Sequence, residues 1–275
     1  MNKKKYKITG LFVFFNLVVL FAISGHAHAE DSKLTYCIAH RGEHDLLVTE
    51  NSFASMKEAI NKQADGVEFD VRHTKDHVPI IMHDKTLLRT ATDKQSGKCP
   101  LRKNISSLNW EEIKTNCKLK DGSEIPTLNE ILVYLEKFNK LDLFTFIELK
   151  DSPHDKTADI IEKHFYDKKD GLRIISFKET YLDKISNRLK FLDEKNFLDL
   201  DLGSWGKSKR YGINVWIKSY NLRKRYFLKL LESKNTEIGV WTVNKEKSML
   251  PLFGKVDFVT TDKISTCINA RNLKH

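Results

Sequence analysis

Short apolar runs alternate with amphipathic stretches along most of this chain. The runs that we expect to form strands are residues 36–39, 66–71, 143–149, 173–177, 189–192, 213–217, 237–243 and 256–260. Apolar positions at helical spacing lie between most of them, at residues 51–62, 157–166, 180–188 and 222–233. Strands that alternate with helices in this way are typical of a parallel closed barrel, so the pattern predicts an α/β fold of the (β/α)8 TIM barrel type.

Residues 84–126 depart from the alternation. They carry the turn signals Gly97, Pro100, Asp121-Gly122 and Pro126, and only one short helix is expected, near residues 109–114. We interpret this stretch as an insertion in the barrel. Because no repeat, low-complexity tract or linker interrupts residues 30–275, we expect them to form a single domain.

The N-terminal 29 residues resemble a cleavable signal peptide. A cluster of lysines precedes the nearly continuous apolar run 8–24, and Ala27-His28-Ala29 matches a cleavage site. An uncleaved membrane anchor is the alternative, although the run is slightly short for a bilayer span. Removing the four lysines of the segment lowers the formal charge from +10 to +6. We therefore predict an exported protein, periplasmic or secreted, with a modest preference for anionic partners.

Four cysteines follow the predicted cleavage site, an even number in a chain that we expect in an oxidising compartment. Three pairings are possible. We favour Cys99 with Cys117, inside the insertion, and Cys37 with Cys267, near the two ends of the chain. The alternative is four free buried thiols, and the spacing matches no zinc motif.

Three short motifs between residues 40 and 84 carry the chemistry. They are His40-Arg41-Gly42, Glu68-Phe69-Asp70 and His83-Asp84. Cleavage of a phosphodiester needs one group that accepts a proton, one that donates a proton, and positive charge near the phosphoryl oxygens. These residue types supply all three, so they indicate a metal-assisted phosphodiester hydrolase.

The carboxylates have the spacing of a metal site. Glu68 and Asp70 lie two apart on a predicted strand and therefore share one face, and Glu148 lies at the end of another strand. The segment 71–82 is too short for a parallel crossover, so we predict a hairpin. A turn centred on Lys75-Asp76 would pair Glu68 with His83. Ligation by oxygen alone favours Mg²⁺ or Ca²⁺.

The chain resembles the glycerophosphodiester phosphodiesterase family over nearly all of its length after residue 37. The matching motifs are Ile38-Ala39-His40-Arg41-Gly42, Glu50-Asn51-Ser52, Asp65-Gly66-Val67-Glu68-Phe69-Asp70, His83-Asp84, Ile147-Glu148-Leu149-Lys150, Val240-Trp241-Thr242-Val243-Asn244 and Thr260-Thr261-Asp262. The resemblance implies a barrel enzyme that cleaves glycerophosphodiesters to glycerol 3-phosphate and an alcohol with one divalent cation. The sequence departs from the family pattern at Thr49, in a longer loop at residues 40–50, and at His77, where a glycine is usual.

The resemblance also implies roles for individual residues. His40 and His83 would be the acid/base pair, with His40 as the base in our hypothesis and the reverse assignment as the alternative. The metal ligands would be Glu68, Asp70 and Glu148. Arg41 and Lys150 would bind the phosphate. Trp241 would face the alcohol or glycerol portion, although it could equally be a core tryptophan. Water or the glycerol 2-hydroxyl could be the nucleophile.

Residues 203–231 contain no acidic residue and interleave basic with aromatic side chains. This pattern is compatible with peripheral contact with an anionic membrane, whereas exposed charge on an ordinary barrel helix is the simpler explanation. We expect no nucleic acid and no protein partner. Two other functions compete with the hydrolase: a lipid-directed, phospholipase D-like enzyme acting on lysophospholipids or sphingomyelin-like substrates, and an inactive barrel used for binding.

Overall fold

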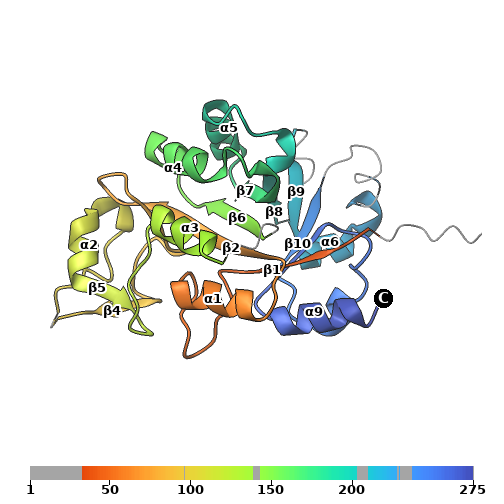
Figure 1. Ribbon diagram of the computed structural model, residues 1–275, viewed down its shortest axis with the longest axis horizontal. Helices are drawn as coiled ribbons and strands as arrows, with labels where there is room; N and C mark the ends of the chain where they lie inside the picture. Colours follow the sequence, from red (N-terminus) through yellow and green to blue (C-terminus); the bar gives the residue numbers. More distant parts are fainter. Residues whose placement is uncertain are drawn as a thin grey trace, which may run out of the picture. The chain divides into compact units, whose positions relative to one another are not determined.

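Parallel strands close into a barrel in the computed structural model, which describes residues 33–95, 97–138, 143–202, 210–227, 229 and 237–274 (Figure 1). The strands of the barrel are β1 (Tyr36–Ala39), β2 (Gly66–His73), β6 (Phe144–Leu149), β7 (Leu172–Ser176), β8 (Phe197–Asp201), β9 (Gly212–Trp216), β10 (Ile238–Trp241) and β11 (Phe258–Thr261). The sheet runs in the order β1-β11-β10-β9-β8-β7-β6-β2, and β1 also pairs with β2, which closes the barrel. The predicted TIM barrel is confirmed.

Helices surround these strands (Figure 1). They are α1 (Phe53–Asn61), α3 (Leu128–Glu136), α4 (Asp155–Phe165), α5 (Glu179–Arg188), α6 (Ile217–Leu222), α8 (Glu246–Met249) and α9 (Ile264–Asn272), with short 3-10 turns η2 (Lys169–Gly171) and η3 (Glu194–Asn196). The stretch that we expected to be helical begins at Asn51, whereas α1 begins at Phe53, because Ser52 is its N-cap and forms a reciprocal capping box with Ser55. Asn51 is thereby free for another role.

Apolar side chains form one core inside the barrel and another around it. Alternate strand residues point inward, and among them Ile38, Phe146 and Phe258 form a small interior core. A larger core lies between strands and helices. Polar side chains occupy inward positions near the carboxyl ends of β2, β6, β9 and β11, and they line the site described below.

One predicted strand is wrong. Residues 189–192 form a turn after α5, and the strand at this place is β8, which begins at Phe197. Leu198 and Leu200 point into the barrel, so the strand alternates apolar with acidic residues. Because acidic residues interrupt its apolar positions, this strand does not form the continuous apolar run that we used to predict strands.

The insertion has its own core and lies to one side of the barrel, beyond the hairpin formed by β2 and β3 (Pro79–Ile81) (Figure 1). It contains β4 (Ala91–Asp93), η1 (Ile105–Ser107), α2 (Trp110–Asn116) and β5 (Cys117–Leu119). β4 and β5 pair antiparallel, and their apolar side chains pack with Ile113. The prediction of an inserted segment with one short helix is confirmed.

Both predicted disulfides are present. Cys99–Cys117 ties the insertion together, and Cys37–Cys267 joins β1 to α9 across a sequence separation of 230. Contacts group Lys33–His275 into one compact unit. The predicted signal peptide and residues 203–209, 228, 230 and 231 of the basic segment lie outside the described residues. Among the described helices, none combines the length and the hydropathy needed to cross a bilayer.

Candidate active site

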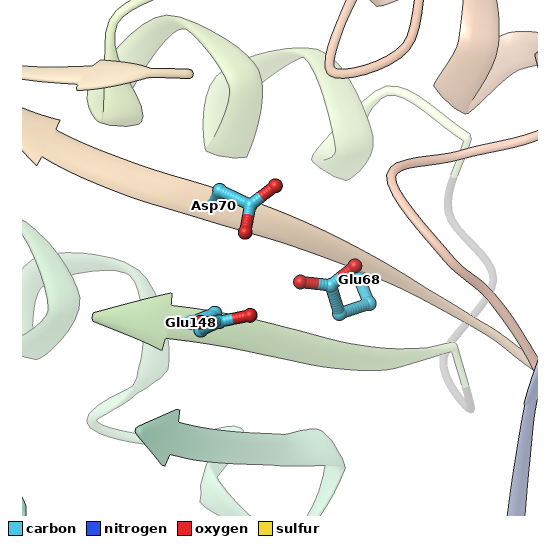
Figure 2. Close-up of side chains that lie close together, drawn as sticks. All are labelled: Glu68, Asp70 and Glu148. Atoms are coloured by element: carbon cyan, nitrogen blue, oxygen red, sulfur yellow. The ribbon is translucent and has the colours of Figure 1, made fainter. Parts of the chain in front are cut away.

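Three buried carboxylates converge on two adjacent strands. Glu68 and Asp70 point from β2, and Glu148, which is the register partner of Asp70, points from β6 (Figure 2). One oxygen from each lies within 4.8 Å of the other two. The side chains are almost inaccessible to solvent, with exposed fractions of 1%, 0% and 6%. Three acidic groups so close together and so deeply buried require positive charge nearby.

The donor atoms fit a divalent cation. Glu68 Oε1 and Asp70 Oδ1 are buried and lack a hydrogen-bond partner within the described part of the chain. Carboxylate oxygens are the ligands that hard cations such as Mg²⁺ and Ca²⁺ bind. The three residues that the sequence predicts as metal ligands are therefore brought together, and two of their oxygens lack a hydrogen-bond partner among the described residues.

The mutual repulsion of these carboxylates appears in their pKa values. Burial, with the charges of Asp70 and Glu148, raises the pKa of Glu68 well above its usual range. Burial and Asp70 likewise raise the pKa of Glu148 to about 7. Burial acts on Asp70 in the same direction, but Arg41, Lys150 and His83 outweigh it and hold its pKa at about 2.

Cationic and amide groups hold the carboxylates in place. The backbone N–H of Arg41 donates to Glu68 at 2.9 Å, and Asn51 donates from its amide to Asp70 at 2.7 Å. Lys150 donates to Glu148 at 2.7 Å and lies 3.5 Å from Asp70. Both predicted phosphate ligands, Arg41 and Lys150, thus stand at the rim of the carboxylate cluster.

His40 is oriented by an acidic residue from the other end of the chain. Its Nδ1 lies 2.7 Å from Oδ1 of Asp262, which follows β11. Asn244 donates to the second oxygen of Asp262 at 2.6 Å. Burial raises the pKa of Asp262, but the hydrogen bonds from His40 and Asn244 outweigh burial and lower this pKa to about 2. Because an ionised carboxylate only accepts, Nδ1 carries the proton and Nε2 is left for chemistry.

His83 has an equivalent partner. Its Nδ1 lies 2.6 Å from Asp84, which Arg89 holds with two hydrogen bonds. Burial lowers the pKa of His83 from its usual value, and Arg41 acts in the same direction, whereas Asp70 opposes both. Two histidine–aspartate pairs therefore lie in the same site.

The hairpin brings His83 to the site with a register one residue away from our expectation. Val71 pairs with Ile81 and His73 with Pro79, so Glu68 does not pair with His83. The backbone N–H of Thr74 donates to the carbonyl of Val78 at 3.1 Å, which leaves a three-residue turn that ends at His77, where φ is 60°. Arg72 then donates from Nε to the carbonyl of His83 at 2.8 Å.

One cavity of about 150 Å³ connects these groups. Of the residues predicted for catalysis, metal binding and substrate binding, only Asp70 does not line this cavity, and its side chain is wholly buried. The predicted residues that line it are His40, Arg41, Glu68, His83, Glu148, Lys150 and Trp241. Ile175, Phe177, Leu200, Asn214 and Thr260 complete the wall. Trp241 lines the cavity, lies edge-on to Phe177 with 5.5 Å between ring centroids, and also packs against the interior apolar core.

Sequence reasoning missed the residues that position the predicted ones. Asp84, Asp262 and Asn51 stood inside the matched motifs but received no role. Glu50 is a further one, since it accepts hydrogen bonds from both Arg41 and Arg89. Their presence in the motifs was the signal, whereas their partners become visible only in the fold.

Comparison with known proteins identifies the class. The sequence profile of the glycerophosphoryl diester phosphodiesterase family matches residues 40–266. A glycerophosphodiester phosphodiesterase of Caldanaerobacter subterraneus subsp. tengcongensis is 30% identical over 246 residues, which cover 86% of this chain and 97% of that protein. The chain belongs to the glycerophosphoryl diester phosphodiesterase family.

Solved structures share the fold. A glycerophosphodiester phosphodiesterase from Thermotoga maritima superposes with a TM-score of 0.66 at 25% identity, covering 86% of this chain and 98% of that one. A phosphodiesterase from Oleispira antarctica, solved with the product sn-glycerol 3-phosphate, gives a TM-score of 0.68 at 21% identity and covers 87% and 97% of the two chains.

Proposed function

We propose that this protein hydrolyses glycerophosphodiesters to glycerol 3-phosphate and an alcohol, using one divalent cation and two histidines. The observation that carries the proposal is the convergence of three buried carboxylates and two aspartate-paired histidines on one cavity. Family membership supports it, as does the product bound to the Oleispira antarctica relative.

In this proposal Glu68, Asp70 and Glu148 hold Mg²⁺ or Ca²⁺. The bound cation would supply positive charge to the phosphoryl oxygens. Arg41 and Lys150 add their own charge at the same rim, Arg41 with a planar fork and Lys150 as a single ammonium. Their present carboxylate partners keep both side chains ordered before the substrate arrives.

The two histidines move the protons. His40, held by Asp262 through Nδ1, uses Nε2 to take a proton from the attacking hydroxyl, either of water or of the glycerol 2-position. Attack by the 2-hydroxyl would form a cyclic phosphate, which water would then have to open to give glycerol 3-phosphate. A new P–O bond forms as the bond to the departing alcohol breaks. His83 donates its proton to the leaving alkoxide, and its lowered pKa makes the protonated imidazole a stronger acid.

A side-by-side assay tests the substrate class. Glycerophosphocholine and lysophosphatidylcholine are each offered to the purified protein with Mg²⁺, with Ca²⁺ and with chelator, and both products are measured. We expect cation-dependent release of choline and glycerol 3-phosphate from the soluble diester. Preferential cleavage of lysophosphatidylcholine would establish the lipid-directed enzyme instead. If neither substrate is turned over, the remaining alternative is an inactive barrel used for binding.

Export is a second part of the proposal. Two disulfides are stable in an oxidising compartment, such as the periplasm or the exterior of the cell. Cleavage near Ala29 is tested by N-terminal sequencing of the protein recovered from the cell that makes it. An intact N-terminus on the mature protein would contradict the predicted signal peptide.

Peripheral membrane contact is the third part. Leu222 is 81% exposed and Tyr226 is 45% exposed, and the chain between them is basic. Such a mixture of apolar and cationic side chains suits an anionic bilayer surface. Sedimentation with phosphatidylglycerol vesicles, compared with phosphatidylcholine vesicles, tests it. Equal recovery with the two lipids would remove the electrostatic contact.

A further inference from the structure

A second part of the cavity wall is also polar. Asn214 comes from β9, which β7 and β8 separate from β6, and Thr260 comes from β11, which β1 separates from β2. Both side chains line the same cavity as His40. The site therefore has a charged wall, formed by the carboxylates, and a second, neutral polar wall, formed by Asn214 and Thr260.

One polar atom of each side chain on this second wall lacks a hydrogen-bond partner in the described part of the chain. Asn214 is 1% exposed and Thr260 is 2% exposed. Asn214 Oδ1 and Thr260 Oγ1 find no hydrogen-bond partner among the described residues. Buried polar atoms in folded proteins nearly always have a partner, because an unpaired one is destabilising. Two such atoms on one cavity point to a ligand that brings hydrogen bonds with it.

The barrel is shaped to keep Asn214 where it is. A Cβ on the neighbouring Gly239 would lie 2.5 Å from Asn214 Oδ1, so any larger residue there would displace the amide from this position. Trp241 donates from its indole nitrogen to the backbone carbonyl of Asn214 at 2.9 Å. The same strand, β10, thus makes space for the amide and places the tryptophan beside it.

We propose that Asn214 and Thr260 bind the free hydroxyl groups of the glycerol portion of the substrate. This inference rests on the proposed function, since it names what the same site selects. The phosphoryl group lies toward Arg41 and the carboxylates, and the glycerol extends across the cavity beside Trp241. An amide and a hydroxyl can each donate and accept, which matches the vicinal diol of an sn-glycerol 3-phosphoryl group. A site built to bond hydroxyls discriminates strongly against substrates that lack them.

The test compares ligands with and without the diol. Thr260→Val removes one hydroxyl at nearly constant volume, and Asn214→Leu removes the amide. For each variant we measure kcat/KM on glycerophosphocholine and on bis(p-nitrophenyl) phosphate, and inhibition by sn-glycerol 3-phosphate and by inorganic phosphate. We expect the preference for glycerophosphocholine to fall about tenfold for Thr260→Val, with inhibition by glycerol 3-phosphate weakened more than inhibition by phosphate.

Stability separates this role from a structural one. Replacing an unpaired buried hydroxyl by a methyl group leaves stability equal or higher, so Thr260→Val should melt at or above the wild-type temperature. Thr145→Val on β6 is the matched control, because Thr145 is similarly buried but does not line the cavity. Thr260→Ser, which keeps the hydroxyl, should retain most of the preference.

Two outcomes would overturn the proposal. One is a wild-type enzyme active on glycerophosphocholine whose substrate and inhibitor preferences are unchanged by Thr260→Val and Asn214→Leu. The other is a structure with bound glycerol 3-phosphate in which water alone occupies this wall. Failure of the proposed function looks different, because the wild-type protein itself would then release no glycerol 3-phosphate.

Discussion

His40 and Asp262 lie 222 residues apart in the sequence and share a hydrogen bond of 2.7 Å at the carboxyl ends of adjacent barrel strands. The bond fixes the imidazole with its proton on Nδ1 and its Nε2 available. Closure of the barrel between β1 and β11 is therefore also what orients the proposed base. The Cys37–Cys267 disulfide joins the same two regions on the outer side of β1.

This pairing predicts the effect of Asp262→Asn. Loss of the carboxylate removes both the orientation and the charge that stabilises the imidazolium, so we expect kcat to fall about 10- to 100-fold. The loss from His40→Ala should be larger, about 10²- to 10⁴-fold. Steady-state kinetics on glycerophosphocholine gives both values. The double variant should be no worse than His40→Ala alone, and additive losses would contradict action of Asp262 through His40.

The two disulfides should stabilise the protein to different degrees. Cys99–Cys117 closes a separation of 18 residues, for which chain entropy gives about 3 kcal/mol, and Cys37–Cys267 closes 230 residues, for which it gives about 5 kcal/mol. Urea unfolding of the paired Cys→Ala variants measures both. We expect Cys37→Ala/Cys267→Ala to be the less stable variant, and Cys99→Ala/Cys117→Ala to become sensitive to protease mainly within the insertion. Equal midpoints and uniform proteolysis would contradict this order.

The burial of His73 predicts that the protein becomes less stable at acidic pH. Burial, together with nearby His154, His77 and Lys184, lowers its pKa from 6.5 to about 3. The unfolded chain binds a proton as pH falls below 6.5 while the folded protein does not, so the free energy of unfolding falls with pH between these values and is unaffected above them. Fully developed, the effect amounts to roughly 5 kcal/mol.

His73→Gln tests this prediction, because glutamine can still bond Thr157, the present partner of the imidazole. The difference in unfolding free energy between variant and wild type should change across the acid range and be constant above it. Parallel pH dependences for the two proteins would exclude His73 as the source.

The sequence motifs predicted most of the site but little of its support. Glu68, Asp70 and Glu148 were predictable because strand alternation and barrel closure bring such positions to one rim. Asp262 was not identified as the partner of His40, since that contact depends on closure of strands distant in sequence. The register of the hairpin was one residue off because His77 adopts a left-handed conformation in a three-residue turn. A search for apolar runs favoured residues 189–192 over β8, whose buried acidic residues alternate with leucines.

The central claim is that the three carboxylates bind the cation on which hydrolysis depends. The most direct measurement is release of glycerol 3-phosphate from glycerophosphocholine by chelator-treated protein as Mg²⁺ or Ca²⁺ is added back, for wild type and Glu148→Gln. We expect no activity without added cation, full recovery in the wild type, and a requirement for about tenfold or more cation in the variant. Undiminished activity of the wild type in chelator, or the same cation dependence for both proteins, would contradict the account.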